Sequence, residues 1–163
     1  KSYFAFCTRA LLLSGDPFRF SADLVPPLVV RSRFRAFGPG RREVRPLFAG
    51  QRGFEEAGTD YETEVEGFEA LEDPSAPGEA IYGISCTLVR GYRHQVRAHL
   101  ASLGYPIAGD PLYNAASVFC EDGIHSPGRE LPLQLYAPGI SFPDPDSGLP
   151  VSVSLPRPDR MNR

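Results

Sequence analysis

The side chains best suited to chemistry are concentrated between residues 90 and 100, in the run RGYRHQVRAHL. A glycine turn and three arginines surround the predicted start of a helix, directly after a predicted strand. Helix N-terminal N–H groups attract anions, and Arg93 and Arg97, four residues apart, would share one helix face with Gln95 as a neutral neighbour. The run therefore predicts a polyanion-binding site. A solvated basic helix is the alternative, which composition alone favours.

Other reactive constellations are missing from the sequence. Cys7, Cys86 and Cys120 show no Cys-x-x-Cys spacing, which favours reduced thiols over a zinc site or a disulfide framework. His94 and His99 lie five residues apart, about 140° around a helix, so they cannot hold one ion from one face. The sequence also lacks a Gly-x-Ser-x-Gly elbow, a Gly-x-x-x-x-Gly-Lys loop and a Gly-x-Gly-x-x-Gly turn. We therefore expect no metal site.

Apolar spacing places these side chains on one helix among several strands. A helix is predicted over residues 93–103, with Val96, Leu100 and Leu103 as its buried stripe and Gly104 at its end. Alternating and β-favouring runs predict strands at residues 3–8, 29–37, 44–49, 61–71, 81–89, 133–142 and 151–155, with loops at 72–79 and 115–128. These elements indicate an α+β fold with a mixed, mostly antiparallel β-sheet and few flanking helices.

Length and charge set further limits. At 163 residues the chain is predicted to form a single domain, residues 1–163. No apolar run approaches the roughly 18 residues of a membrane span, so no membrane partner is expected. The net charge of −3 hides a segregation, because residues 1–53 carry ten basic and three acidic side chains while residues 54–80 carry ten acidic ones and no Lys or Arg. The basic third either offers a local phosphate-binding face or pairs with the acidic segment.

The run from residue 91 to residue 113, GYRHQVRAHLASLGYPIAGDPLY, resembles the signature of the RluA-type RNA pseudouridine synthases. Their characteristic string is Gly-Arg-x-His-Gln-Ile-Arg-x-His-Leu, followed by Gly-x-Pro-Ile-x-Gly-Asp-x-x-Tyr. Residues 1–5, KSYFA, are similar to the family's Lys-x-Tyr-x-Ala strand, and residues 135–156 are similar to its closing hairpin. Tyr92 and Tyr136 depart from the pattern, since the family usually has Arg and His there. These departures bear on fine RNA contacts more than on the type of reaction.

The resemblance implies an RNA pseudouridine synthase, an isomerase that converts uridine to pseudouridine in ribosomal or transfer RNA without a cofactor or a metal. It also implies that Arg97 pairs with the catalytic Asp carboxylate and that Tyr3 stacks on the extruded base. The predicted RNA-binding residues are Arg90, Arg93, His94 and Gln95. The expected partner is a structured RNA with a flipped or unpaired uridine, because a base inside a helix is unreachable. The expected setting is a monomer in the cytoplasm.

The family's nucleophile is missing from the sequence. Its catalytic Asp lies in an Arg-x-Leu-Asp motif upstream of the Lys-x-Tyr-x-Ala strand, and residues 1–163 contain no Arg-x-Leu-Asp. The sequence is therefore interpreted as the C-terminal, larger part of a pseudouridine synthase catalytic domain, expected to be inactive by itself. The alternatives are a non-catalytic RNA-binding protein derived from the family and a small β-rich interaction domain. His99 is expected to be a buried helix residue, and a core position is the alternative for Tyr3.

Overall fold

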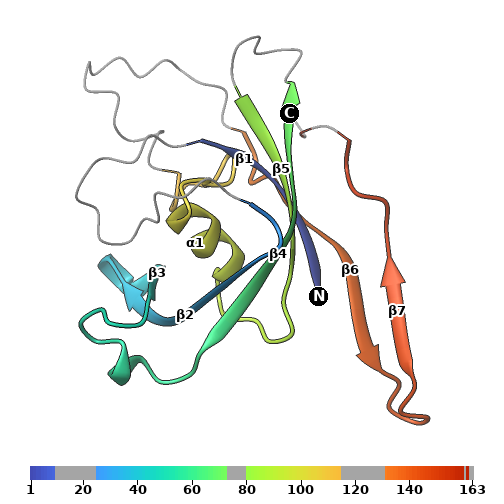
Figure 1. Ribbon diagram of the computed structural model, residues 1–163, viewed down its shortest axis with the longest axis horizontal. Helices are drawn as coiled ribbons and strands as arrows, with labels where there is room; N and C mark the ends of the chain where they lie inside the picture. Colours follow the sequence, from blue (N-terminus) through green and yellow to red (C-terminus); the bar gives the residue numbers. More distant parts are fainter. Residues whose placement is uncertain (10–24, 73–79, 115–130, 160, 162–163) are drawn as a thin grey trace.

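The computed structural model describes residues 1–9, 25–72, 80–114, 131–159 and 161 (Figure 1). Its strands are β1 (Ser2–Thr8), β2 (Leu28–Phe37), β3 (Glu43–Leu47), β4 (Tyr61–Glu72), β5 (Ala80–Thr87), β6 (Leu135–Pro143) and β7 (Pro150–Ser154). The described helices are α1 (Gln95–Ser102) and two short 3₁₀ turns, η1 (Pro39–Arg41) and η2 (Glu55–Ala57). The seven strands form one sheet in the order β3-β2-β4-β5-β1-β6-β7.

Every pairing between neighbouring strands of the described residues is antiparallel. The predicted α+β class is therefore confirmed, and the parallel pairs of a mixed sheet do not occur in this part of the chain. The strands predicted on either side of Gly38 pair with each other as β2–β3, and the closing hairpin implied by the resemblance is present as β6–β7. The predicted loop at 115–128 lies outside the described residues. The predicted loop at 72–79 also lies outside them, except for Glu72, which is the last residue of β4 and pairs with Ala80 of β5. Among the described residues, no helix is long and apolar enough to cross a membrane.

Strand β1 separates two buried layers, because successive side chains of a strand point to opposite faces. Ala5 and Cys7 face α1 and belong to the larger cluster of buried side chains. Phe4 and Phe6 face the other side, where they pack with Ile81. Figure 1 shows α1 lying against one face of the sheet, inside the curve formed by β2 and β4. The sheet is thus a curved platform that carries one helix.

Helix α1 begins two residues later than predicted. His94, which precedes it, has a φ of 58° in the left-handed region, so the helical backbone does not reach back to Arg93. The prediction that Arg93 shares a helix face with Arg97 is therefore wrong. The helix ends at Ser102, one residue before the predicted end, and Gly104 follows the C-cap Leu103 with a φ of 87°, as expected of a glycine just past a helix end. The predicted stripe of Val96, Leu100 and Leu103 is buried as expected.

Candidate active site

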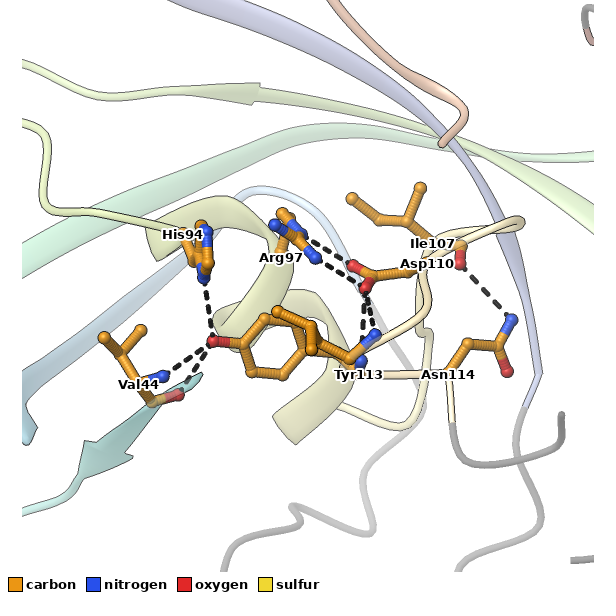
Figure 2. Close-up of polar contacts among 8 residues, drawn as sticks. Val44, His94, Arg97, Ile107, Asp110, Tyr113 and Asn114 are labelled. Atoms are coloured by element: carbon orange, nitrogen blue, oxygen red, sulfur yellow. Dashed lines mark hydrogen bonds and ion pairs between the residues drawn. The ribbon is translucent and has the colours of Figure 1, made fainter. Parts of the chain in front are cut away.

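The centre of the candidate site is an ion pair between Arg97 on α1 and Asp110 in the turn that follows the helix (Figure 2). The Nε of Arg97 donates to Oδ2 at 2.8 Å, and its Nη2 donates to Oδ1 at 2.7 Å. The Asp110 side chain is fully buried, whereas 12% of the Arg97 side chain is exposed. The hydrogen bond to Asp110 raises the pKa of Arg97 above its already high usual value. The two-point contact therefore fixes a permanent positive charge in one orientation, just beneath the surface.

The turn after α1 holds the carboxylate of Asp110 in place. Oδ1 also accepts the backbone N–H groups of Leu112 at 2.9 Å and Tyr113 at 3.1 Å, which is the turn geometry typical of Asp. Gly109 has a φ of 71°, and a Cβ there would lie 2.3 Å from the carbonyl oxygen of Pro132. Only glycine fits this position without movement of the neighbouring chain. The Gly-Asp dipeptide thus places Asp110 where Arg97 can reach it.

Tyr113 ties the same turn to strand β3. Its hydroxyl accepts the N–H of Val44 at 2.8 Å and donates to the carbonyl oxygen of Val44 at 3.1 Å. The Nδ1 of His94 lies 3.3 Å from this hydroxyl, and since the hydroxyl proton is used toward Val44, Nδ1 is the donor in this contact. Burial, together with the charges of Arg97 and Arg93, lowers the pKa of His94. His94 is therefore neutral at pH 7 and serves to connect α1 with the turn, as Figure 2 shows.

The predicted RNA-binding residues lie in different environments. Gln95 is buried, and its amide donates to the carbonyl of Glu62 at 2.7 Å and to Oγ1 of Thr63 at 3.1 Å. Arg90 and Arg93 are exposed. Arg90 lies over the ring of Tyr61 at 5.2 Å from its centroid. Contact with RNA stays a prediction for Arg90 and Arg93, and the burial of Gln95 argues against a direct contact there.

Arg93 reaches across to the β2–β3 hairpin instead of lying along α1. Its Nη2 donates to the carbonyl oxygens of Arg41 and Glu43. These two acceptors belong to the tip of the hairpin, so Arg93 joins the tip to the start of α1.

Tyr3 lies on the side of the sheet that faces α1. It is paired with Cys86 of β5 and is partly buried against the larger core cluster, to which α1 contributes Val96 and Leu100. The structure therefore puts Tyr3 and Arg97 on the same side of the sheet. Partial burial fits both a stacking role and a core role, so the role of Tyr3 stays a prediction.

His99 is a structural residue, as expected. Its side chain is fully buried, with Nε2 2.7 Å from Oγ of Ser32 and Nδ1 2.8 Å from Oγ1 of Thr63. Burial lowers its pKa to about 3. The imidazole therefore stays neutral and links α1 to β2 and β4.

The reactive groups present in the described residues are limited. No cluster of three or more His, Cys, Asp or Glu side chains suited to a metal ion occurs among them. Among the described carboxylates, Asp110 is the one paired with Arg97, as the catalytic Asp is expected to be. Its two oxygens accept four hydrogen bonds and its side chain is fully buried, so it cannot approach a ribose. Asp110 therefore supports Arg97 and does not itself attack.

Asp110 and Tyr113 lie in the run from residue 91 to residue 113, but no role was predicted for either residue. A signal for Asp110 was available, because the Gly-Asp-Pro sequence of residues 109–111 is typical of a turn, and an Asp side chain in a turn commonly accepts hydrogen bonds from the backbone N–H groups that follow it. No comparable signal existed for Tyr113, whose partner Val44 lies 69 residues away along the chain.

Known proteins similar to this chain share one described activity. No protein-family model matches the chain. A ribosomal large subunit pseudouridine synthase D of Neisseria meningitidis serogroup A is 37% identical over 78 residues, which are 47% of this chain and 21% of that protein. An RNA pseudouridine synthase 1 of Oryza sativa subsp. japonica is 36% identical over 83 residues, 48% of this chain and 22% of that protein.

A solved structure has a fold similar to that of this chain. The human RNA pseudouridylate synthase domain containing 1 matches 96% of this chain and 54% of its own chain, with a TM-score of 0.61 and 20% sequence identity. The matched part thus spans about half the length of that structure and between a fifth and a quarter of the curated relatives. Over about half of its length this chain is therefore similar to proteins named as ribosomal large subunit or RNA pseudouridine synthases, and it shares the fold of a pseudouridylate synthase domain.

Proposed function

We propose that the protein containing this chain isomerises uridine to pseudouridine in ribosomal or transfer RNA. The observation that carries the proposal is the Arg97–Asp110 pair, which holds a guanidinium in a fixed orientation within the run of residues 91–113 that resembles the family signature. The names of several relatives, ribosomal large subunit pseudouridine synthase D among them, support the same activity and favour ribosomal RNA.

In this proposal, Arg97 pairs with the Asp carboxylate that starts the reaction. The hydrogen bonds of Arg97 to described residues use Nε and Nη2, and both go to Asp110. A second carboxylate would meet Arg97 at Nη1, where the positive charge lowers the pKa of that carboxyl group and keeps it ionised. Asp110 would hold the guanidinium still while the second carboxylate reacts. The reacting Asp belongs to an Arg-x-Leu-Asp segment that residues 1–163 do not contain.

Tyr3 would take the base side of the reaction. From the side of the sheet that faces α1, its ring would stack on the extruded uracil and assist removal of the proton from C5. Arg90, Arg93 and His94 would meet the RNA backbone nearby, and no cofactor takes part. We propose further that the protein acts as a cytoplasmic monomer.

The direct test uses RNA labelled with tritium at C5 of uridine. Formation of the C5–C1′ bond releases that tritium to water, so release measures the isomerisation itself. A protein that includes an upstream Arg-x-Leu-Asp segment should release tritium, and residues 1–163 alone should release none. Release by residues 1–163 alone would show that the nucleophile lies within them and that the assignment of Asp110 as a support is wrong.

A non-catalytic RNA-binding protein is the second candidate, favoured by the missing Arg-x-Leu-Asp motif. It predicts salt-dependent binding of structured RNA with no tritium release, even when the upstream residues are present. Release from the longer protein rejects this candidate.

A further inference from the structure

The outer face of the β2–β3 hairpin carries arginines of two kinds. Arg31 and Arg33 of β2 form ion pairs with acidic residues in and just before β4. Arg31 binds Glu62 at 2.6 Å, and Arg33 binds Asp60 at 2.6 Å. For these two residues, the basic and acidic segments of the sequence do pair with each other. Their charges are therefore already balanced within the fold.

Toward the tip of the hairpin this balance ends. Arg35 of β2 lies directly opposite Arg45 of β3 in the antiparallel register. Arg41 and Arg42 follow in the exposed connection between the strands. Glu43 is the single acidic residue between residues 24 and 54 of the sequence. No ion pair of Arg35, Arg41 or Arg42 with a carboxylate is found among the described residues.

This arrangement has a physical cost for a free protein. Like charges placed directly opposite each other on neighbouring strands destabilise a sheet. The guanidinium of Arg45 lies 3.2 Å from the ring centroid of Phe37, a cation–π contact that helps hold Arg45 in place. A polyanion lying along the tip would balance the charges of Arg35, Arg41 and Arg42. Arginine, with its planar fork of donors, is well suited to contact phosphate oxygens.

The tip also adjoins the candidate active site. Arg93, beside α1, donates to the carbonyls of Arg41 and Glu43, and Tyr113 binds both backbone groups of Val44. Figure 2 shows Val44 of β3 next to His94 and Tyr113, with Arg97 on the adjacent helix turn. The backbone of the hairpin tip is therefore bonded to the residues that flank Arg97.

We propose that the tip of the β2–β3 hairpin, through Arg35, Arg41 and Arg42, binds the phosphate backbone of the RNA beside the target uridine. This inference rests on the proposed function, since it takes RNA as the substrate. The proposed surface lies outside the run of residues 91–113. It is distinct from Arg31 and Arg33, which are already paired with carboxylates. The surface contributes affinity, and the chemical step depends on Arg97.

The test compares two double variants of the protein that carries the upstream segment. Arg35→Gln with Arg42→Gln removes two tip charges and leaves Arg41, whose φ is 52°, undisturbed. Arg31→Gln with Arg33→Gln is the matched control, because it removes two charges of the same strand that are already paired. Binding of a uridine-containing RNA stem–loop is measured between about 50 and 200 mM salt, and urea midpoints check that both variants are folded.

The tip variant should bind RNA more weakly, with a slope of log K against log salt that is smaller by about two, roughly one per lost phosphate contact. The control should keep the wild-type slope, and single-turnover rates at saturating RNA should agree for all three proteins. If the tip variant binds RNA with wild-type affinity and slope, the inference is wrong. It is also wrong if the tip variant keeps its RNA binding but loses binding to anionic vesicles or to an acidic protein. If the wild type itself binds no RNA, the proposed function fails instead.

Discussion

Two neighbouring regions of the molecule use arginine in opposite ways. Arg97 is nearly buried and gives two hydrogen bonds to one carboxylate that the Gly109–Asp110 turn holds in place. The arginines Arg35, Arg41 and Arg42 at the tip of the β2–β3 hairpin are exposed. A buried charge needs an exact partner and so becomes part of the architecture, whereas an exposed charge stays available for a ligand. The difference separates a region that positions from a region that binds.

Loss of the buried partner should have the largest effect on stability. Asp110→Asn leaves the Arg97 guanidinium without its carboxylate, and breaking a buried pair from one side costs about 3–5 kcal/mol. Urea unfolding measures this cost. The exposed pair Arg31–Glu62 provides the contrast, since Arg31→Gln should cost about 1 kcal/mol or less.

Equal losses for the two variants would contradict the statement that burial makes the Arg97–Asp110 pair part of the architecture. A cycle with Arg97→Met, Asp110→Asn and the double variant sharpens the result. The double variant should be less destabilised than the sum of the two single variants, because it leaves no buried charge unpaired.

The helix beneath Arg97 should be nearly as sensitive. Leu100 is fully buried on the inner face of α1, and Leu100→Ala should lower the free energy of unfolding by about 2–5 kcal/mol. Arg42→Ala at the exposed tip of the hairpin should change it by no more than about 0.5 kcal/mol. Denaturant unfolding compares the two, and a change below about 0.5 kcal/mol for Leu100→Ala would show that the helix is not packed as described.

A smaller effect, graded with pH, should come from His99. Burial lowers its folded-state pKa to about 3, whereas an unfolded His titrates near 6.5. Below pH 6.5 the unfolded chain binds a proton that the folded chain does not, so this stabilisation is complete above 6.5 and lost as the pH falls toward 3. The loss is about 1.4 kcal/mol per pH unit within that window.

Urea unfolding at pH 7.5, 6 and 5 measures the dependence, and His99→Gln should make it shallower by that amount. An unchanged slope in the variant would mean that His99 does not titrate as its burial requires. The hairpin carries no His, so variants at its tip should keep the full wild-type slope.

The strands and the apolar stripe of α1 were predictable because they depend on local periodicity. Val30, Ser32 and Phe34 alternate with exposed or partly exposed arginines, and the structure keeps that alternation as one buried and one outer face of β2. The Arg97–Asp110 pair was not predictable in the same way. It depends on how the chain returns between Gly104 and Gly109, which periodicity does not describe.

The start of α1 shows the same limit. The left-handed backbone of His94 has no clear signal in the sequence, and it moves Arg93 off the helix and toward the hairpin. Gln95 was predicted to bind RNA, yet its partners are backbone and side-chain groups of β4, about 30 residues earlier. Contacts between distant elements, rather than local preferences, decide these positions.

The most direct test of the account compares Arg97→Met with Arg93→Met in the protein that carries the upstream Arg-x-Leu-Asp segment. Single-turnover tritium release and RNA-binding isotherms are measured for both. Arg97→Met should slow the conversion of bound RNA by orders of magnitude with little change in affinity, because the reacting carboxylate loses its partner. Arg93→Met should weaken binding and lower the salt slope by about one, with the rate on bound RNA largely kept. A near wild-type rate for Arg97→Met would contradict the account and leave the motif as a surface that only binds RNA.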